Sequence, residues 1–191
     1  MRQPGEVTTG GGTAGNERLT AMTGAVLIAV LAAVGVTIVW IGQLLWLHMF
    51  LGLLVIGPVA LKLASTGYRF VRYYTDSVPY RRKGPPHPLL RGLAPLVVLS
   101  TLAVLATGVA LLLLGPSSRH PLVLLHKVSF IAWVAFVALH ILGHLPELAR
   151  LPIRGASAGG RAGRWISLCG ALVAGAILAI ALVGQFSAWT R

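Results

Sequence analysis

Residues 122–145 have the sequence LVLLHKVSFIAWVAFVALHILGHL, in which Lys127 is the only residue that is charged at neutral pH. About 20 consecutive apolar residues suffice for a helix to cross the hydrocarbon core of a bilayer, so this stretch predicts a membrane-spanning helix. Similar apolar runs occupy residues 19–41, 44–74, 89–114 and 165–186. The sequence therefore predicts an all-α membrane protein with five transmembrane helices between residues 19 and 186. Residues 1–18, rich in glycine and without apolar periodicity, predict a disordered cytoplasmic tail.

The composition agrees with a membrane location. Of 191 residues, 56% are hydrophobic and 10% are charged, whereas soluble domains have about 25% charged residues. Sixteen basic and four acidic residues give a net charge of +12. The apolar runs exclude a soluble nucleic-acid-binding protein, and we attribute the positive charge to topology and to contact with anionic lipid head groups. Cys169 is the single cysteine, and the sequence has no C-x-x-C-H motif, which excludes disulfides, cysteine metal sites and covalently bound haem.

The distribution of basic residues predicts the orientation. Six lie between or beside the second and third spans, and four lie between the fourth and fifth: Arg69, Arg72, Arg81, Arg82, Lys83 and Arg91, then Arg150, Arg154, Arg161 and Arg164. The positive-inside rule then places the N-terminus in the cytoplasm and the C-terminus outside. Tryptophan and tyrosine also gather where the span boundaries are expected. The abundance of Ala, Gly, Leu, Val and Arg favours a bacterial cytoplasmic membrane.

Histidines within the spans are the clearest chemical signal, because ionisable residues at membrane depth are costly and usually functional. His126 and His140 are fourteen residues apart, which on a helix corresponds to a ~40° offset and ~21 Å of rise. His144 also falls on that face. Histidines at two depths on one helix suit two cofactors stacked across the membrane.

His48 matches His126 in depth, since each lies five residues into a run that begins at the outer surface. Two neutral imidazoles from facing helices can bind both axial positions of a haem iron, so we expect these two histidines to hold an outer haem b. Gly52, one turn beyond His48, leaves space for a porphyrin. The alternative is that the histidines only form hydrogen bonds between helices.

An inner haem is expected at His140, with His87 or His144 as the opposite ligand. His144 lies on the same helix as His140, which favours His87, provided that its proline-rich segment folds back under the bundle. Alternatively, His87 and His144 bind the inner haem together. A further alternative is that the protein binds only one haem. His120, in an outer loop before Pro121, is expected to be structural.

This arrangement resembles the di-haem b-type cytochromes that anchor bacterial formate dehydrogenase and nickel–iron hydrogenase. The resemblance rests on His126 and His140 on one helix with His48 on an earlier span. It implies a four-helix haem-binding bundle, here with a fifth helix, that passes electrons between quinone and a partner redox enzyme. More narrowly, residues 18–148 are similar to a group of uncharacterised actinobacterial membrane proteins.

The chain departs from that family in its first span, which offers Met22 and no histidine as a ligand. We expect an electron-transfer subunit rather than a stand-alone enzyme, with quinone near Arg69, Arg72 and Tyr73. The alternatives are a cofactor-free membrane anchor and a small transporter. Against a transporter, the spans contain no acidic residue and, away from their cytoplasmic ends, only Lys62 and Lys127 as cations. Gly170, Ala174, Gly175 and Ala179 predict that the fifth span is a packing helix.

Overall fold

The computed structural model describes residues 13–75, 78–81, 88–148 and 160–190, and within these ranges it contains helices and no strands. Five helical stretches are long and apolar enough to cross a membrane, which confirms the predicted multi-pass all-α class. The elements are α1 (Thr13–Val39), α2 (Ile41–Leu54), α3 (Ile56–Tyr74), α4 (Val78–Arg81), α5 (Pro88–Leu114), η1 (Pro116–Ser118), α6 (Arg119–Leu148), α7 (Arg161–Ala181), η2 (Val183–Phe186) and α8 (Ser187–Thr190).

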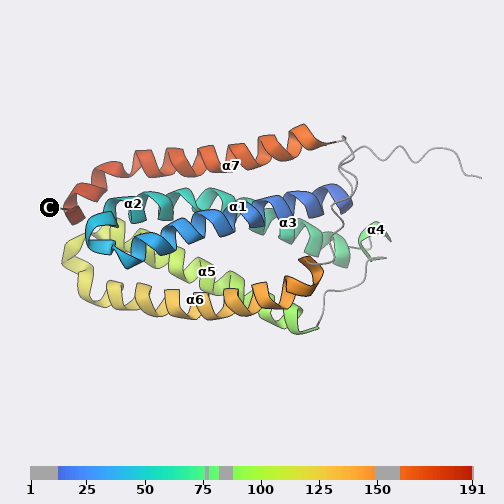
Figure 1. Ribbon diagram of the computed structural model, residues 1–191, viewed down its shortest axis with the longest axis horizontal. Helices are drawn as coiled ribbons and strands as arrows, with labels where there is room; N and C mark the ends of the chain where they lie inside the picture. Colours follow the sequence, from blue (N-terminus) through green and yellow to red (C-terminus); the bar gives the residue numbers. More distant parts are fainter. Residues whose placement is uncertain (1–12, 76–77, 82–87, 149–159, 191) are drawn as a thin grey trace, which may run out of the picture.

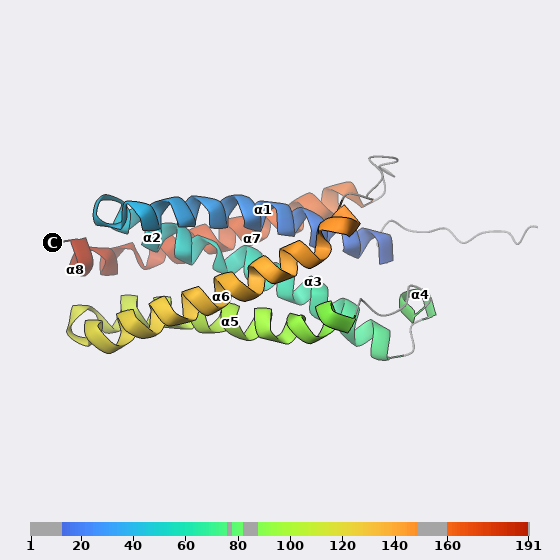
Figure 2. The ribbon, with the colours of Figure 1, turned by 60° about the horizontal axis from the view of Figure 1, so that its bottom comes forward.

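The long helices form two groups that lie side by side (Figures 1 and 2). Helices α1, α2, α3 and α7 pack together, and α5 and α6 form a closely packed helical hairpin. The most extensive backbone contact between the two groups is that of α2 with α5. Helices α2, α3 and α6 run in one direction along the bundle, and α1 and α5 run in the other (Figure 1).

The two ends of the bundle differ in their side chains. At one end, here called the Trp40 end, α1 turns into α2 and η1 joins α5 to α6 (Figure 1). Trp46 stacks on Phe50 there, and the Arg119 guanidinium lies over the Trp189 ring. At the opposite end, here called the Tyr74 end, α3 ends and Arg91 of α5 donates a hydrogen bond to the Tyr74 hydroxyl. Both ends thus have the aromatic and basic side chains that are typical of membrane interfaces.

The second span is broken near its middle. Helix α2 ends at Leu54 and α3 begins at Ile56, two residues before the proline of the Gly57-Pro58 pair at which the sequence predicts a kink. Pro58 has no N–H, so it cannot donate the helical hydrogen bond that the Leu54 carbonyl would otherwise accept. Hydrogen bonds from Val55 N to Leu51 O (3.0 Å) and from Val59 N to Val55 O (3.0 Å) keep the two halves joined.

Helix α7 packs against this break through backbone contacts. The Leu54 carbonyl oxygen lies so close to Gly175 that a β-carbon there would overlap it. In the same way, a β-carbon on Gly57 would overlap the carbonyl oxygen of Ala171. Gly175 and Ala179 are buried, as a packing helix requires, whereas Gly170 and Ala174 are exposed. The small residues on one face of α7 therefore permit a close helix crossing.

Apolar side chains elsewhere point outward. Buried clusters are small and centre on Leu27, Val55 and Val59 and on Leu53, Leu112, Ala179 and Phe186. By contrast Ile131, Ile166 and Ile177 are each more than 60% exposed on their helices. A soluble monomer rarely exposes apolar surface of this extent, which is accounted for by contact with lipid.

The helix boundaries correct the sequence prediction at several points. Helix α1 begins at Thr13, so the predicted disordered tail is wrong for residues 13–18, and residues 1–12 lie outside the described part. The last span ends at Ala181 rather than Phe186, because the short 3₁₀ turn η2 follows it. The fourth span continues past Leu145 to Leu148.

Replacing Gly175 tests this packing. We expect Gly175→Ala to lower the stability of the folded protein by about 1–3 kcal/mol, because the new methyl group forces the backbones of α2 and α7 apart. Thermal unfolding in detergent measures the effect. Gly170→Ala, on the same helix with open space around its β-carbon, is the matched control and should leave the melting temperature unchanged. Equal melting temperatures for both variants would contradict the described crossing.

Candidate functional site

His48 lies on α2, half-buried near the Trp40 end, and its ring is held by a threonine of α1. Its Nδ1 is 2.9 Å from the Thr37 hydroxyl oxygen. The Thr37 hydroxyl donates its own proton to the Val34 carbonyl oxygen at 2.5 Å. Because a hydroxyl has one proton to donate, Thr37 must accept the hydrogen bond from His48. The proton of the His48 imidazole is therefore on Nδ1.

His126 of α6 has an equivalent environment. Its Nδ1 is 3.0 Å from the hydroxyl oxygen of Thr107 on α5, and that hydroxyl donates to the Ala103 carbonyl oxygen at 2.8 Å. Thr107 is buried, and Ser129 lies 3.2 Å from its hydroxyl oxygen while donating to the His126 carbonyl oxygen at 2.9 Å. Thr107 also lies 3.0 Å from the Val104 carbonyl oxygen, and when its hydroxyl donates to one of these carbonyl oxygens, a proton on Nδ1 of His126 completes the contact between the two side chains.

With the proton on Nδ1, the lone pair of each ring lies on Nε2. The contacts with Thr37 and Thr107 engage Nδ1 of His48 and of His126. A hydrogen bond from Nδ1–H to an oxygen fixes the tautomer and orientation of a histidine that binds a metal through Nε2. Such an arrangement therefore has the donor chemistry of a metal ligand.

The two histidines also lie near each other. His48 and His126 lie close enough to interact electrostatically, although they come from the two different helix groups. Helices α1, α2, α5 and α6 each supply one member of the two threonine–histidine pairs. The matched depth that the sequence predicts for these histidines agrees with this proximity.

Glycines leave space beside both rings. A β-carbon on Gly108 of α5 would lie 3.2 Å from Cε1 of His126, so glycine accommodates the ring there. Gly52, one turn beyond His48, has open space where a β-carbon would project, as expected from the sequence.

His140 and His144 lie further along α6, towards the Tyr74 end. Their ring centroids are 4.7 Å apart, at an interplanar angle of 68°. Nδ1 of His140 is buried and has no hydrogen-bond partner among the described residues. An unsatisfied buried nitrogen costs about 1–3 kcal/mol and requires an explanation. Edge-to-face contact between the rings also leaves no room for a macrocycle between them.

Lys62 of α3 is a further polar group at this level, and the sequence prediction gave it no role. Its ammonium donates to the Thr20 carbonyl oxygen of α1 at 2.7 Å, and it lies close enough to His140 to interact electrostatically. Gly24, one turn beyond Thr20, makes room for it, since a β-carbon there would lie 3.1 Å from Nζ. In the sequence, the one sign that Lys62 has a role was its position as a lone cation in an otherwise apolar run.

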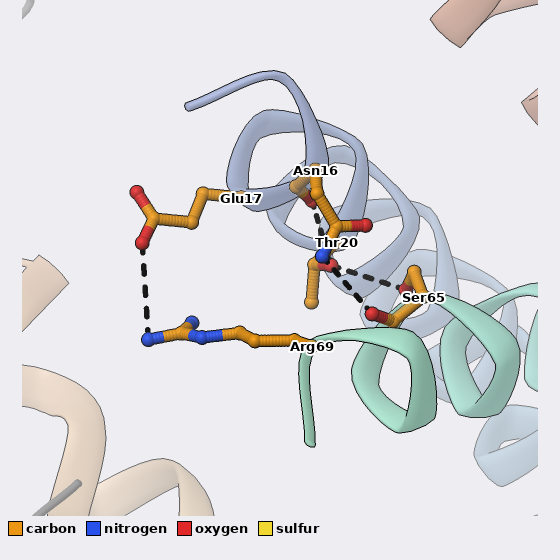
Figure 3. Close-up of polar contacts among 5 residues, drawn as sticks. All are labelled: Asn16, Glu17, Thr20, Ser65 and Arg69. Atoms are coloured by element: carbon orange, nitrogen blue, oxygen red, sulfur yellow. Dashed lines mark hydrogen bonds and ion pairs between the residues drawn. The ribbon is translucent and has the colours of Figure 1, made fainter. Parts of the chain in front are cut away.

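Polar contacts between α1 and α3 continue from Lys62 to the Tyr74 end (Figure 3). The Thr20 hydroxyl is 3.1 Å from the Ser65 hydroxyl, and Asn16 Nδ2 donates to the Ser65 carbonyl oxygen at 3.1 Å. Glu17 and Arg69 form an ion pair of 3.8 Å at the more exposed end of this series. Residues 13–18, expected to be disordered, thus help to fix α1 against α3.

The remaining predicted residues are not gathered at one place. His120 is exposed at the start of α6, and Met22 is half-buried on α1. Arg72 is exposed, and Tyr73 packs edge-on against Tyr74. His87 lies outside the described residues. Within the described part of the chain, no group of three or more His, Cys, Asp or Glu side chains is placed to hold a metal ion.

Comparison with protein-family models, with curated proteins and with solved structures finds no match to this chain.

The threonine hydroxyls offer a test of the histidine geometry. We expect Thr37→Val and Thr107→Val each to destabilise the protein by about 1 kcal/mol, because each leaves an imidazole N–H without its acceptor inside the membrane. Unfolding in detergent measures the loss. Thr75→Val, which removes an exposed hydroxyl bonded only to the Val71 carbonyl oxygen, is the control. If the three variants are equally stable, the assigned hydrogen bonds do not hold the rings.

Proposed function

We propose that this protein is a membrane-embedded b-type cytochrome, of the class that the di-haem anchor subunits represent. The observation that carries the proposal is the neighbouring pair His48 and His126, which interact electrostatically and each have Nδ1 bonded to a threonine hydroxyl. A six-coordinate haem b takes two axial donors from the protein and has no other covalent attachment to it. It therefore does not require the larger ligand cluster of a mononuclear metal site.

The residues present fit such a group. Two neutral imidazoles with available Nε2 atoms would hold the iron, and Thr37 and Thr107 would orient them through Nδ1. Gly108 and Gly52 limit the side-chain bulk next to the two rings. The apolar helices around them exclude water, which favours retention of a non-covalently bound cofactor. Bound haem would supply a one-electron ferric–ferrous couple.

The inner part of the proposal is a second haem at His140. Support for it comes from the fourteen-residue spacing from His126 and from the buried, unpartnered Nδ1 of His140. His144 contacts His140 from the same helix, so the two do not suit opposite faces of one macrocycle. The opposite ligand favoured by the sequence is His87.

The role proposed for the chain is electron transfer across or within the membrane, as a subunit that connects the quinone pool with a partner redox protein. The chain would contribute ligands, orientation and burial, and the redox chemistry would belong to the cofactor. The basic and aromatic residues at the Tyr74 end, including Arg72 and Tyr73, are the proposed surroundings of a quinone. A cofactor-free anchor or a small transporter would have no haem spectrum, which separates those alternatives from this one.

Replacement of either outer ligand should have the same spectral consequence. We expect His48→Ala and His126→Ala each to remove the same low-spin haem, because each takes away one axial ligand of one iron. Reduced-minus-oxidised absorption spectra and haem quantification of the purified protein measure the loss. His120→Ala, exposed on the same helix as His126, should keep the wild-type spectrum. Retention of the full low-spin spectrum in both ligand variants would disprove the pairing.

Orientation is a separate prediction. From the positive-inside rule and the basic residues at the Tyr74 end, we expect that end in the cytoplasm and the C-terminus outside. A phosphatase fused after Arg191, active only outside the cytoplasm, should therefore be active. If a reporter that is active only in the cytoplasm were active at that position instead, the topology would be the reverse of the predicted one. The outer and inner sites would then be exchanged.

A further inference from the structure

The spacing between the two histidines of α6 recurs on the α2–α3 segment of the other helix group. His48 and Lys62 are fourteen residues apart on the α2–α3 segment, and His126 and His140 are fourteen residues apart on α6. Both segments run from the Trp40 end to the Tyr74 end (Figure 1). Because fourteen helical residues rise by ~21 Å, Lys62 and His140 are expected at similar depths, although the break between α2 and α3 does not preserve the helical phase of His48.

The electrostatics agrees with this similar depth. His48 and His126 lie close enough to interact electrostatically, and so do Lys62 and His140. Helix α1 anchors the α2–α3 member at both levels, through the Thr37 hydroxyl for His48 and through the Thr20 carbonyl oxygen for Lys62. Lys62 thus combines an anchor on α1 with proximity to His140, as His48 combines an anchor on α1 with proximity to His126.

The donor chemistry of Lys62 is suitable. A neutral primary amine has one lone pair and two N–H bonds, so it can bind a metal ion while it still donates to the Thr20 carbonyl oxygen. That hydrogen bond would direct the lone pair, as the threonine bonds do for the histidines. Thr20 also donates its hydroxyl to the Asn16 carbonyl oxygen at 2.8 Å, which fixes this part of α1.

We propose that Lys62 is the axial ligand opposite His140 in the second haem, which would then have one imidazole and one amine ligand. This inference rests on the proposed function and replaces His87 as the ligand opposite His140. On coordination the Nζ–iron bond forms and the ammonium loses one proton to the solvent at the Tyr74 end. The iron does not change its oxidation state in this step. Met22 and His87 then have no ligand role.

Ligand substitution in the full-length protein tests the proposal. Haem content per chain is measured by pyridine haemochrome, and axial ligands are identified by near-infrared magnetic circular dichroism, whose charge-transfer band distinguishes imidazole–amine from bis-imidazole iron. Wild-type protein should hold two haems, one of each kind. Lys62→Ala and Lys62→Arg should both lose the imidazole–amine signal, since neither alanine nor a guanidinium can coordinate. Lys62→His should convert that signal into a second bis-imidazole one.

Lys127→Ala removes the other cation within the spans and should keep both signals, as should His87→Ala and Met22→Leu. Two bis-imidazole haems in the wild type, or an unchanged spectrum in Lys62→Arg, would overturn the assignment of Lys62. A wild type with one haem, lost in His48→Ala, would also overturn it while leaving the proposed cytochrome intact. A wild type without haem would instead refute the proposed function. If Lys62→Ala fails to fold, the wild-type spectrum and the Lys62→His conversion still decide the question.

Discussion

The hydrogen bond from a histidine Nδ1 to a threonine hydroxyl is the interaction on which the candidate site depends. In a bilayer no water satisfies a buried imidazole, so the ring must find a partner within the protein. Thr37 and Thr107 are such partners, and each has already committed its own proton to a backbone carbonyl oxygen one turn earlier. The threonines then accept, and a histidine that donates from Nδ1 keeps its lone pair on Nε2.

The bundle brings these rings, one from each helix group, close enough to interact electrostatically. On one side, Gly57 and Gly175 let α7 approach the broken second span at backbone distance, and on the other, α5 and α6 form a closely packed hairpin. Contact between the groups is made mainly by α2 and α5. Polar side chains of α2, α3 and α6 therefore lie between two compact units. Since these helices run in one direction, equal spacings along them keep facing residues at equal depth.

Hydropathy alone was sufficient to predict the five spans, because uninterrupted apolar runs of this length have few other stable structures. Helix ends were predicted less well. Thr13–Arg18 were assigned to a tail for want of apolar residues, yet Asn16 and Glu17 make side-chain contacts with α3 that stabilise another turn and a half of α1. The break was expected at Gly57-Pro58 and lies at Val55, since a proline disrupts the hydrogen bond to the residue four positions before it.

The candidate site was predicted only in part. Depth and helical phase led to the prediction that His48 pairs with His126, which stays a prediction. The threonines were missed, because their contacts depend on the rotation of each helix about its axis. Lys62 was noted only as a cation in an apolar span, since its relation to His140 requires the relative placement of α3 and α6.

Haem content is the most direct test of the central claim that facing histidines bind iron in this membrane bundle. The measurement is the absorption spectrum and pyridine haemochrome of the full-length wild-type protein, purified in detergent from cells supplied with haem. We predict a reducible Soret band and two molecules of haem b per chain. A folded, helical protein that contains no haem under these conditions would contradict the claim.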